Sequence, residues 1–164
     1  MQYHLAQLNI ARMKGEIDSP VMASFVARLD EINALAEFSP GFVWRLKTEA
    51  GDATSIQLYE DDRIIVNFSV WEDLGSLREF VYRTMHGAVM RQRRDWFERM
   101  EDFYYVLWWV PAGSIPSLEA AKERLEYLRV HRETAYAFTF ADPKPSPEIS
   151  IDIDLSGVRD GCPA

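Results

Sequence analysis

Apolar side chains recur along this chain with two periods, one typical of strands and the other of helices. Alternation by two predicts strands at residues 3–10, 42–47, 55–58, 64–71, 103–110 and 135–140. Spacing by three or four predicts helices at residues 20–38, at 73–100 with a break near Gly87, and from residue 117 onward. Caps and turn residues separate these segments: Pro20 suits a first helical turn, Asp73 a helix start, and Ser39-Pro40-Gly41 a helix end.

This order of elements predicts an α+β fold, a ferredoxin-like βαββαβ unit extended by one more helix and strand. With 164 residues, 48% of them hydrophobic, the chain can bury one core, so we expect a single domain over residues 1–141. Residues 142–164 form an acidic, Pro-rich tail. Four aliphatic residues alternate with polar ones within 149–155, so the tail is either disordered or an edge strand, laid on this subunit or swapped onto another.

Composition and charge exclude several classes of partner. A formal net charge of -8 argues against a nucleic-acid surface, because phosphate binding relies on clustered Lys and Arg. No apolar run reaches membrane-spanning length, and the residues after Met1 lack the pattern of a signal peptide. We therefore expect a cytoplasmic protein. Cys162 is the single cysteine, which excludes an internal disulfide. The adjacent carboxylates of residues 60–62 lack the spacing of a calcium loop, and no metal site is predicted.

A polar patch is expected at the centre of the sheet. In the ferredoxin-like order the first and third strands are neighbours, so Gln7 and Asn9 should adjoin Asn67, Ser69 and Trp71. Burying an unsatisfied amide costs roughly 1–3 kcal/mol, so these groups must satisfy one another, hold water or bind a ligand. Two interpretations stay open. One is a structural hydrogen-bond network with ordered water; the other is a pocket whose amides donate to a ligand oxygen, with Trp71 as an aromatic wall.

The second helical region adds candidate chemistry. A lone His86 there is more often structural, but its ordinary pKa suits a general base and a neutral imidazole could ligate haem iron. Arg91 and Arg94 belong to a run of arginines whose positive charge is largely balanced by neighbouring Asp and Glu residues. One of these arginines, turned inward, could stabilise negative charge on a bound ligand. Trp96 and Trp109 are further candidate ligand contacts.

Several segments resemble the family called domain of unknown function 3291 (DUF3291). They are residues 86–98, the distinctive run Leu107-Trp-Trp-Val-Pro-Ala-Gly113 and Ala137-Phe-Thr-Phe140, with Gln7-Leu-Asn9 near the start. The resemblance covers residues 2–141. It implies a dimeric α+β barrel, in which the sheets of two ferredoxin-like subunits pack face to face.

At superfamily level, the third strand and second helix are similar to those of the antibiotic-biosynthesis monooxygenases. That resemblance implies cofactor-independent oxygenation of phenolic polyketides, with relatives that bind haem. Asn67, Trp71 and His86 match polar, Trp and His positions of that group in kind and order. Leu77 stands where some of those enzymes place a tyrosine, which speaks against phenol oxidation.

Three functions follow as hypotheses. The first is a monooxygenase-like enzyme, without a cofactor, that acts on a small aromatic or polyketide-like molecule. The second is a non-catalytic homodimer that binds haem through His86, or another hydrophobic molecule. The third is a structural dimer whose polar cluster holds only water. The expected substrate contacts are Gln7, Asn9, Trp71, Trp96 and Trp109, and the expected reactive groups are Asn67, His86, Arg91 and Arg94.

Overall fold

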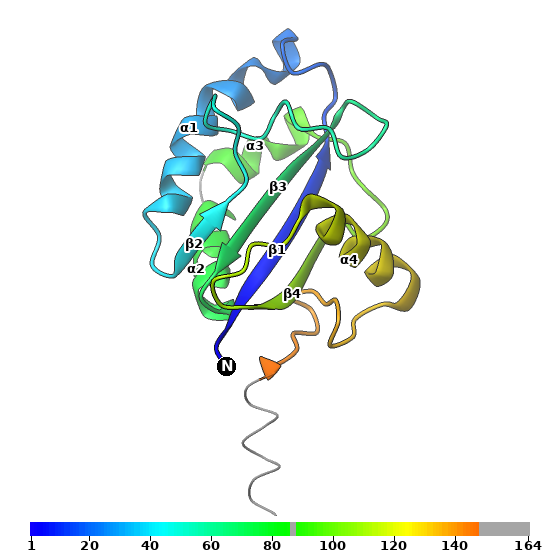
Figure 1. Cartoon of the computed structure of the whole chain (residues 1–164). Helices are drawn as coiled ribbons and strands as arrows, with labels where there is room; N and C mark the ends of the chain where they lie inside the picture. The colour runs from blue at the N-terminus through cyan, green and yellow to red at the C-terminus, as the bar shows by residue number, and fades with distance from the viewer. Residues whose placement is uncertain (86–87, 148–164) are drawn as a thin grey trace, which may run out of the picture.

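The computed structural model describes residues 1–85 and 88–147 (Figure 1). Within that part of the chain, four antiparallel strands form one sheet in the order β2-β3-β1-β4. The strands are β1 (Tyr3–Arg12), β2 (Phe42–Arg45), β3 (Ile64–Trp71) and β4 (Tyr105–Pro111). This is the ferredoxin-like order, with β1 and β3 at the centre, and the α+β fold class is therefore confirmed.

Helices cover both faces of this sheet. They are the 3-10 turn η1 (Pro20–Met22), α1 (Ala23–Glu37), α2 (Leu74–Met85), α3 (Ala88–Trp96) and α4 (Leu118–His131). The predicted cap at Asp73 is present, because its Oδ1 accepts from the Ser76 amide at 2.7 Å. Ser117, where a helix was expected to start, is also a cap, and its Oγ accepts from the Ala120 amide at 3.1 Å. Ser19, at the start of the first helical region, makes no side-chain capping bond. The second helical region ends at Trp96 rather than at residue 100.

The two sheet faces carry different cores. One face, with Leu5 and Trp71, packs against residues of α1 and α2 such as Ala36 and Leu77. The opposite face is apolar throughout its centre and packs against α4, which Figure 1 shows on the other side of the sheet from α2 and α3. The buried residues of this second core include Leu8, Val70, Trp108, Leu125 and Leu128. Trp108 and Trp109 thus lie on opposite faces, as strand alternation predicts.

The apolar face that was expected to pack on a second subunit is covered within the single chain. Leu8 and Val106 are fully buried by α4 and by partly buried side chains of residues 46–59. This face is therefore not free to pack against the sheet of a second subunit. The homodimer stays a prediction.

Two expected strands are absent from the described structure. Residues 55–58 pair with no strand, because Ile56 donates to the Ala53 carbonyl in a turn and packs on the α4-side core. Residues 135–140 make only one bridge, Leu107 with Phe138, because Thr134 donates to the Ala137 carbonyl and holds the preceding segment in a turn. The expected edge strand within 149–155 lies outside the described residues, and the domain limit at residue 141 stays a prediction. None of the described helices has the length and apolar character needed to cross a membrane.

Candidate functional site

A cavity of about 530 Å³ lies between the sheet and helices α1, α2 and α3. Its volume is within the range of small-molecule sites, which are concave and mostly apolar with a few polar groups. The sheet contributes Gln7, Asn9, Ala11, Ile65, Asn67 and Tyr105. The helices contribute Phe25, Leu29, Ile32, Asn33, Leu77, Phe80, Val81, Arg93 and Trp96. Aromatic and aliphatic walls thus face a floor that carries amides.

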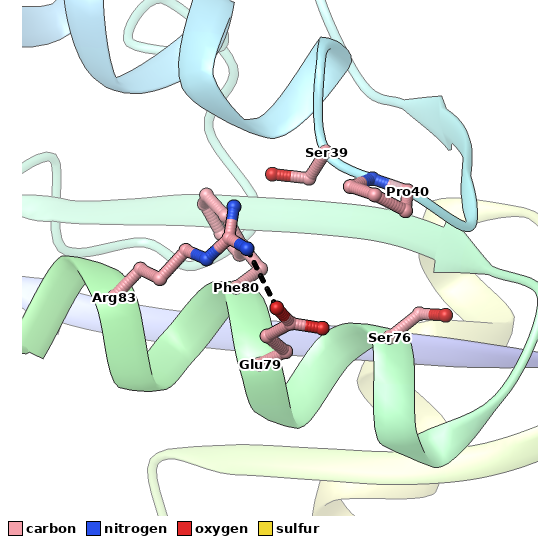
Figure 2. Close-up of a pocket in the computed structure, with 6 residues that line it drawn as sticks. All are labelled: Ser39, Pro40, Ser76, Glu79, Phe80 and Arg83. Carbon is pink, nitrogen blue, oxygen red and sulfur yellow. Dashed lines mark hydrogen bonds and ion pairs between the residues drawn. The ribbon is translucent and has the colours of Figure 1, made fainter.

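A second recess lies where α1 ends beside α2, and Figure 2 shows it in close-up. It has essentially no free volume, and an ion pair of 2.6 Å joins Arg83 Nη2 to Glu79 Oε1 there. The residues around it are Ser39, Pro40, Ser76, Glu79, Phe80 and Arg83. We therefore place the candidate site in the larger cavity.

The predicted polar patch is present on the cavity floor. Strand register places Asn9 opposite Asn67 and Gln7 opposite Ser69. Gln7 Nε2 donates to Asn67 Oδ1 at 2.6 Å and to Ser69 Oγ at 3.0 Å. Gln7 is buried, whereas Asn67 is exposed although Val66 and Phe68 beside it are buried. The floor therefore combines a structural network with an amide that is open to the cavity.

The expected tryptophan contacts differ in position. Trp71 is fully buried, donates from Nε1 to Ser69 Oγ at 2.9 Å and stacks on Phe80 at 5.0 Å. Phe80, rather than Trp71, lines the cavity. Trp109 lies outside the lining and donates to the Lys144 carbonyl at 2.9 Å. Trp96 does line the cavity, and its Nε1 donates to Ser24 Oγ at 2.8 Å.

The arginine that lines the cavity is Arg93, not Arg91 or Arg94, which are both exposed outside it. The Arg93 guanidinium lies over the Tyr104 ring, 5.2 Å from its centroid. No carboxylate among the described residues forms an ion pair with it. Arg93 precedes Trp96 by three residues and Phe97 by four, so helical spacing places it on the same face as these two lining residues. That spacing is a signal that could have identified Arg93 from sequence.

Other charged groups at the cavity already have partners. Arg45 contacts Glu37 Oε1 at 2.8 Å and donates to the Gly51 carbonyl at 2.7 Å. Asp52 Oδ1 accepts from the Thr54 amide and hydroxyl. Among the described lining residues, Arg93 is therefore the countercharge available to an anionic ligand.

Tyr105 is a lining residue that the sequence reasoning missed. Its hydroxyl accepts from the Phe140 amide at 3.2 Å. Burial raises the pKa of Tyr105 above its ordinary value, so the phenol is protonated at neutral pH and serves as a donor rather than a base. Its alternation with buried Val106 and its position opposite Asn9 are the signals that place it on this face.

His86, predicted as a proton-transfer group and as a haem ligand, lies outside the described residues. Over the part of the chain that the structure describes, no group of three His, Cys, Asp or Glu side chains could hold a metal ion.

The family model described as "Domain of unknown function (DUF3291)" matches residues 4–152. The chain belongs to this family. No curated protein matches this chain.

Solved structures resemble the chain only distantly. A mutant of SnoaB, a cofactor-independent oxygenase from Streptomyces nogalater, is 16% identical, with a TM-score of 0.44 over 68% of this chain and 95% of that one. A protein of unknown function from Nitrosomonas europaea is 14% identical, with a TM-score of 0.44 over 71% of this chain and 97% of that one. A second structure of SnoaB, at 17% identity, has a TM-score of 0.40 over 70% of this chain and 98% of that one. Similarity at this level leaves the activity of the chain open.

Proposed function

We propose that this DUF3291 chain is a small-molecule enzyme that acts on an aromatic substrate with an ionisable oxygen, by monooxygenase-like chemistry without a cofactor. The observation that carries the proposal is the cavity itself, in which Arg93 and Asn67 face a space lined by Phe25, Phe80 and Trp96. Such walls contact a flat ring, and the guanidinium and amide can hold an oxygen anion. A cytoplasmic location and a homodimer belong to the same proposal.

The chemistry needs what these residues offer. In oxygenation without a cofactor, the ionised substrate supplies all four electrons that reduce dioxygen. A ring C–H group becomes a quinone carbonyl that keeps one oxygen atom, and the other oxygen atom leaves as water with the two hydrogens that the phenol loses. The protein's task is then to stabilise the phenolate or enolate form in a site with little water. Arg93 supplies positive charge, and Asn67 and Tyr105 supply hydrogen-bond donors. Proton transfer by His86 remains part of the proposal.

The roles expected of Arg91, Arg94 and Trp71 pass to other residues in this proposal. Arg93 takes the electrostatic role, because the neighbouring arginines are exposed outside the cavity. Phe80 takes the role of the ring wall, with Trp71 stacked behind it.

Dioxygen uptake tests the proposal. The substrates are phenols with one ring, two fused rings or three fused rings, each compared with its methyl ether. We expect uptake with phenols and none with the ethers, which cannot ionise. Arg93→Met should reduce kcat/KM by about 10- to 100-fold, since a hydrogen bond to a charged group contributes roughly 1.5–3 kcal/mol. Arg94→Met is the matched control, since it removes an exposed arginine one position away, and should behave as wild type.

Two results would contradict the proposal. Absence of uptake over the whole panel would remove the oxygenase reaction. Equal activity of the Arg93→Met and Arg94→Met proteins would remove the role of Arg93 in the cavity.

A further inference from the structure

A chain of hydrogen bonds runs along the cavity floor from a buried indole to an open amide. Trp71 begins it, because an indole N–H can only donate, and it donates to Ser69 Oγ at 2.9 Å. Trp71 is held on both sides by rings, stacked on Phe80 at 5.0 Å and edge-on to Phe42 at 5.4 Å. This end of the chain is fully buried and is therefore fixed.

Gln7 connects that fixed end to Asn67. Its Nε2 donates to Ser69 Oγ at 3.0 Å and to Asn67 Oδ1 at 2.6 Å, so both hydrogens of the amide group are used. Gln7 is 9% exposed and lies on the central strand β1, opposite Ser69. Rotation of this amide alone would bring Gln7 Oε1 against Asn67 Oδ1, and these two acceptors cannot bond to each other. The contact with Asn67 would be lost in a buried setting, where an unmade hydrogen bond is costly.

Asn67 is therefore held in one orientation. Its Oδ1 faces Gln7, and its Nδ2 is the remaining polar atom of an exposed side chain that lines the cavity. Among the described residues, none accepts a hydrogen bond from this Nδ2. At the cavity surface this donor is thus without an acceptor in the described part of the chain.

We propose that Gln7 is a positioning residue, which fixes the Asn67 amide with its NH₂ group toward the cavity and so makes the site selective for ligands that present an acceptor oxygen or nitrogen there. The inference deepens the proposed function and rests on it for the ligand, because a carbonyl or phenolate oxygen is such an acceptor. Gln7 itself need not touch the ligand. Its effect is to determine which end of the Asn67 side-chain amide points into the cavity, the donor NH₂ group or the acceptor oxygen, which are nearly equal in size.

Side-chain amide hydrogen exchange, measured by NMR without ligand, tests the orientation directly. We expect slow exchange of the Gln7 NH₂ group, whose hydrogens are both bonded, and fast exchange of the Asn67 NH₂ group. Spectra of the Gln7→Glu and Asn67→Asp proteins assign the two signals, because each variant lacks one NH₂ group. Slow exchange at Asn67 with fast exchange at Gln7 would overturn the inference, whether or not any ligand binds.

Ligand preference tests the consequence. The probes are quinoline, whose ring nitrogen only accepts, and indole, whose N–H only donates; both are small, flat and neutral. We expect wild-type protein to bind quinoline more tightly. Gln7→Glu places an acceptor beside Asn67, so that the Asn67 NH₂ group turns toward Glu and its oxygen faces the cavity. The ratio of the two dissociation constants should then shift toward indole by about ten-fold.

Two controls separate this effect from damage and from charge. Gln57→Glu makes the same chemical change at an exposed position outside the cavity and should leave the ratio unchanged. Gln7→Met removes both hydrogen bonds and should bring the ratio close to one, with far-ultraviolet circular dichroism reporting whether the fold is kept. A ratio that is the same in wild type and Gln7→Glu would overturn the positioning role. Failure of both probes to bind any of the proteins would count against the proposed aromatic site alone, since the exchange measurement still decides the orientation.

Discussion

Tyr59 shows how burial on the α4 side changes the chemistry of a single residue. Its hydroxyl donates to Glu126 Oε1 at 3.2 Å, and Lys122 Nζ lies 4.6 Å from the centroid of its ring. Burial, followed by the negative charge of Glu126, raises the pKa of Tyr59 from its ordinary 10.0 to about 12. The folded protein therefore favours the protonated phenol.

We predict that wild-type protein loses stability between pH 10 and about 12 to a greater extent than Tyr59→Phe protein. The sign follows from the raised pKa: the contribution is fully present below the unfolded value and is lost as the pH rises through the folded value. Phenolate absorbance, taken as wild type minus Tyr59→Phe, should give a midpoint near 12, with circular dichroism confirming that both remain folded. A midpoint near 10 would contradict the prediction.

Much of the polar cluster could be predicted from sequence, because strand order and the period of two fix which side chains are neighbours. Gln7 and Asn67 were placed together on that basis, and they share a hydrogen bond. Whether Trp71 faces the cavity could not be predicted, since this depends on its rotamer and on the packing of Phe80. To select Arg93 among three nearby arginines, one must know which face of α3 points to the cavity. Trp96 lies on that face, three residues after Arg93, so the spacing of the two residues gives this information.

Helix α4 is the element that closes the second sheet face. Its residues Ala121, Leu125 and Leu128 are fully buried against the strands, whereas Val130 points to solvent and is 76% exposed. The helix starts at a capped Ser117, as the sequence predicts. Its packing partner was not predicted, because sequence alone left that sheet face available for a second subunit.

We predict that Leu125→Ala lowers the free energy of unfolding by about 2–5 kcal/mol, the usual cost of a cavity in a well-packed core. The matched control is Val130→Ala on the same helix, expected to stay within about 0.5 kcal/mol of wild type. Urea unfolding followed by tryptophan fluorescence measures both values. A small effect of Leu125→Ala would mean that α4 does not pack on the sheet in solution.

Strand predictions failed where an apolar pattern was short and lay beside a turn. Residues 55–58 and 135–140 both contain alternating apolar positions, which satisfied the pattern for a strand. In the structure Ala137 is buried in the core on the α4 side and Ile56 is partly buried against it, but turns use the neighbouring backbone groups. Burial, rather than pairing, explains the apolar residues in these two segments.

The two faces of the sheet differ across the whole molecule, since one carries a cavity and the other a closed core. The face toward α1, α2 and α3 carries the cavity and its amide network. The other face is closed by α4 and residues 46–59, and Figure 1 shows α4 lying across it. A ferredoxin-like subunit without α4 would leave that face open for a partner, which is the arrangement that the family resemblance implied. In this chain α4 covers that face.

We therefore predict that backbone amides of α4 exchange hydrogen at the same rate at low and at high protein concentration. If two chains packed sheet to sheet, α4 would have to leave the surface formed by Leu8, Val70 and Trp108, and its amides would exchange faster as dimer accumulated. Hydrogen exchange detected by mass spectrometry measures this, and light scattering on the same solutions gives the mass of the particle. A dimer with unchanged α4 exchange uses another surface, whereas a dimer with faster α4 exchange would restore the face-to-face arrangement.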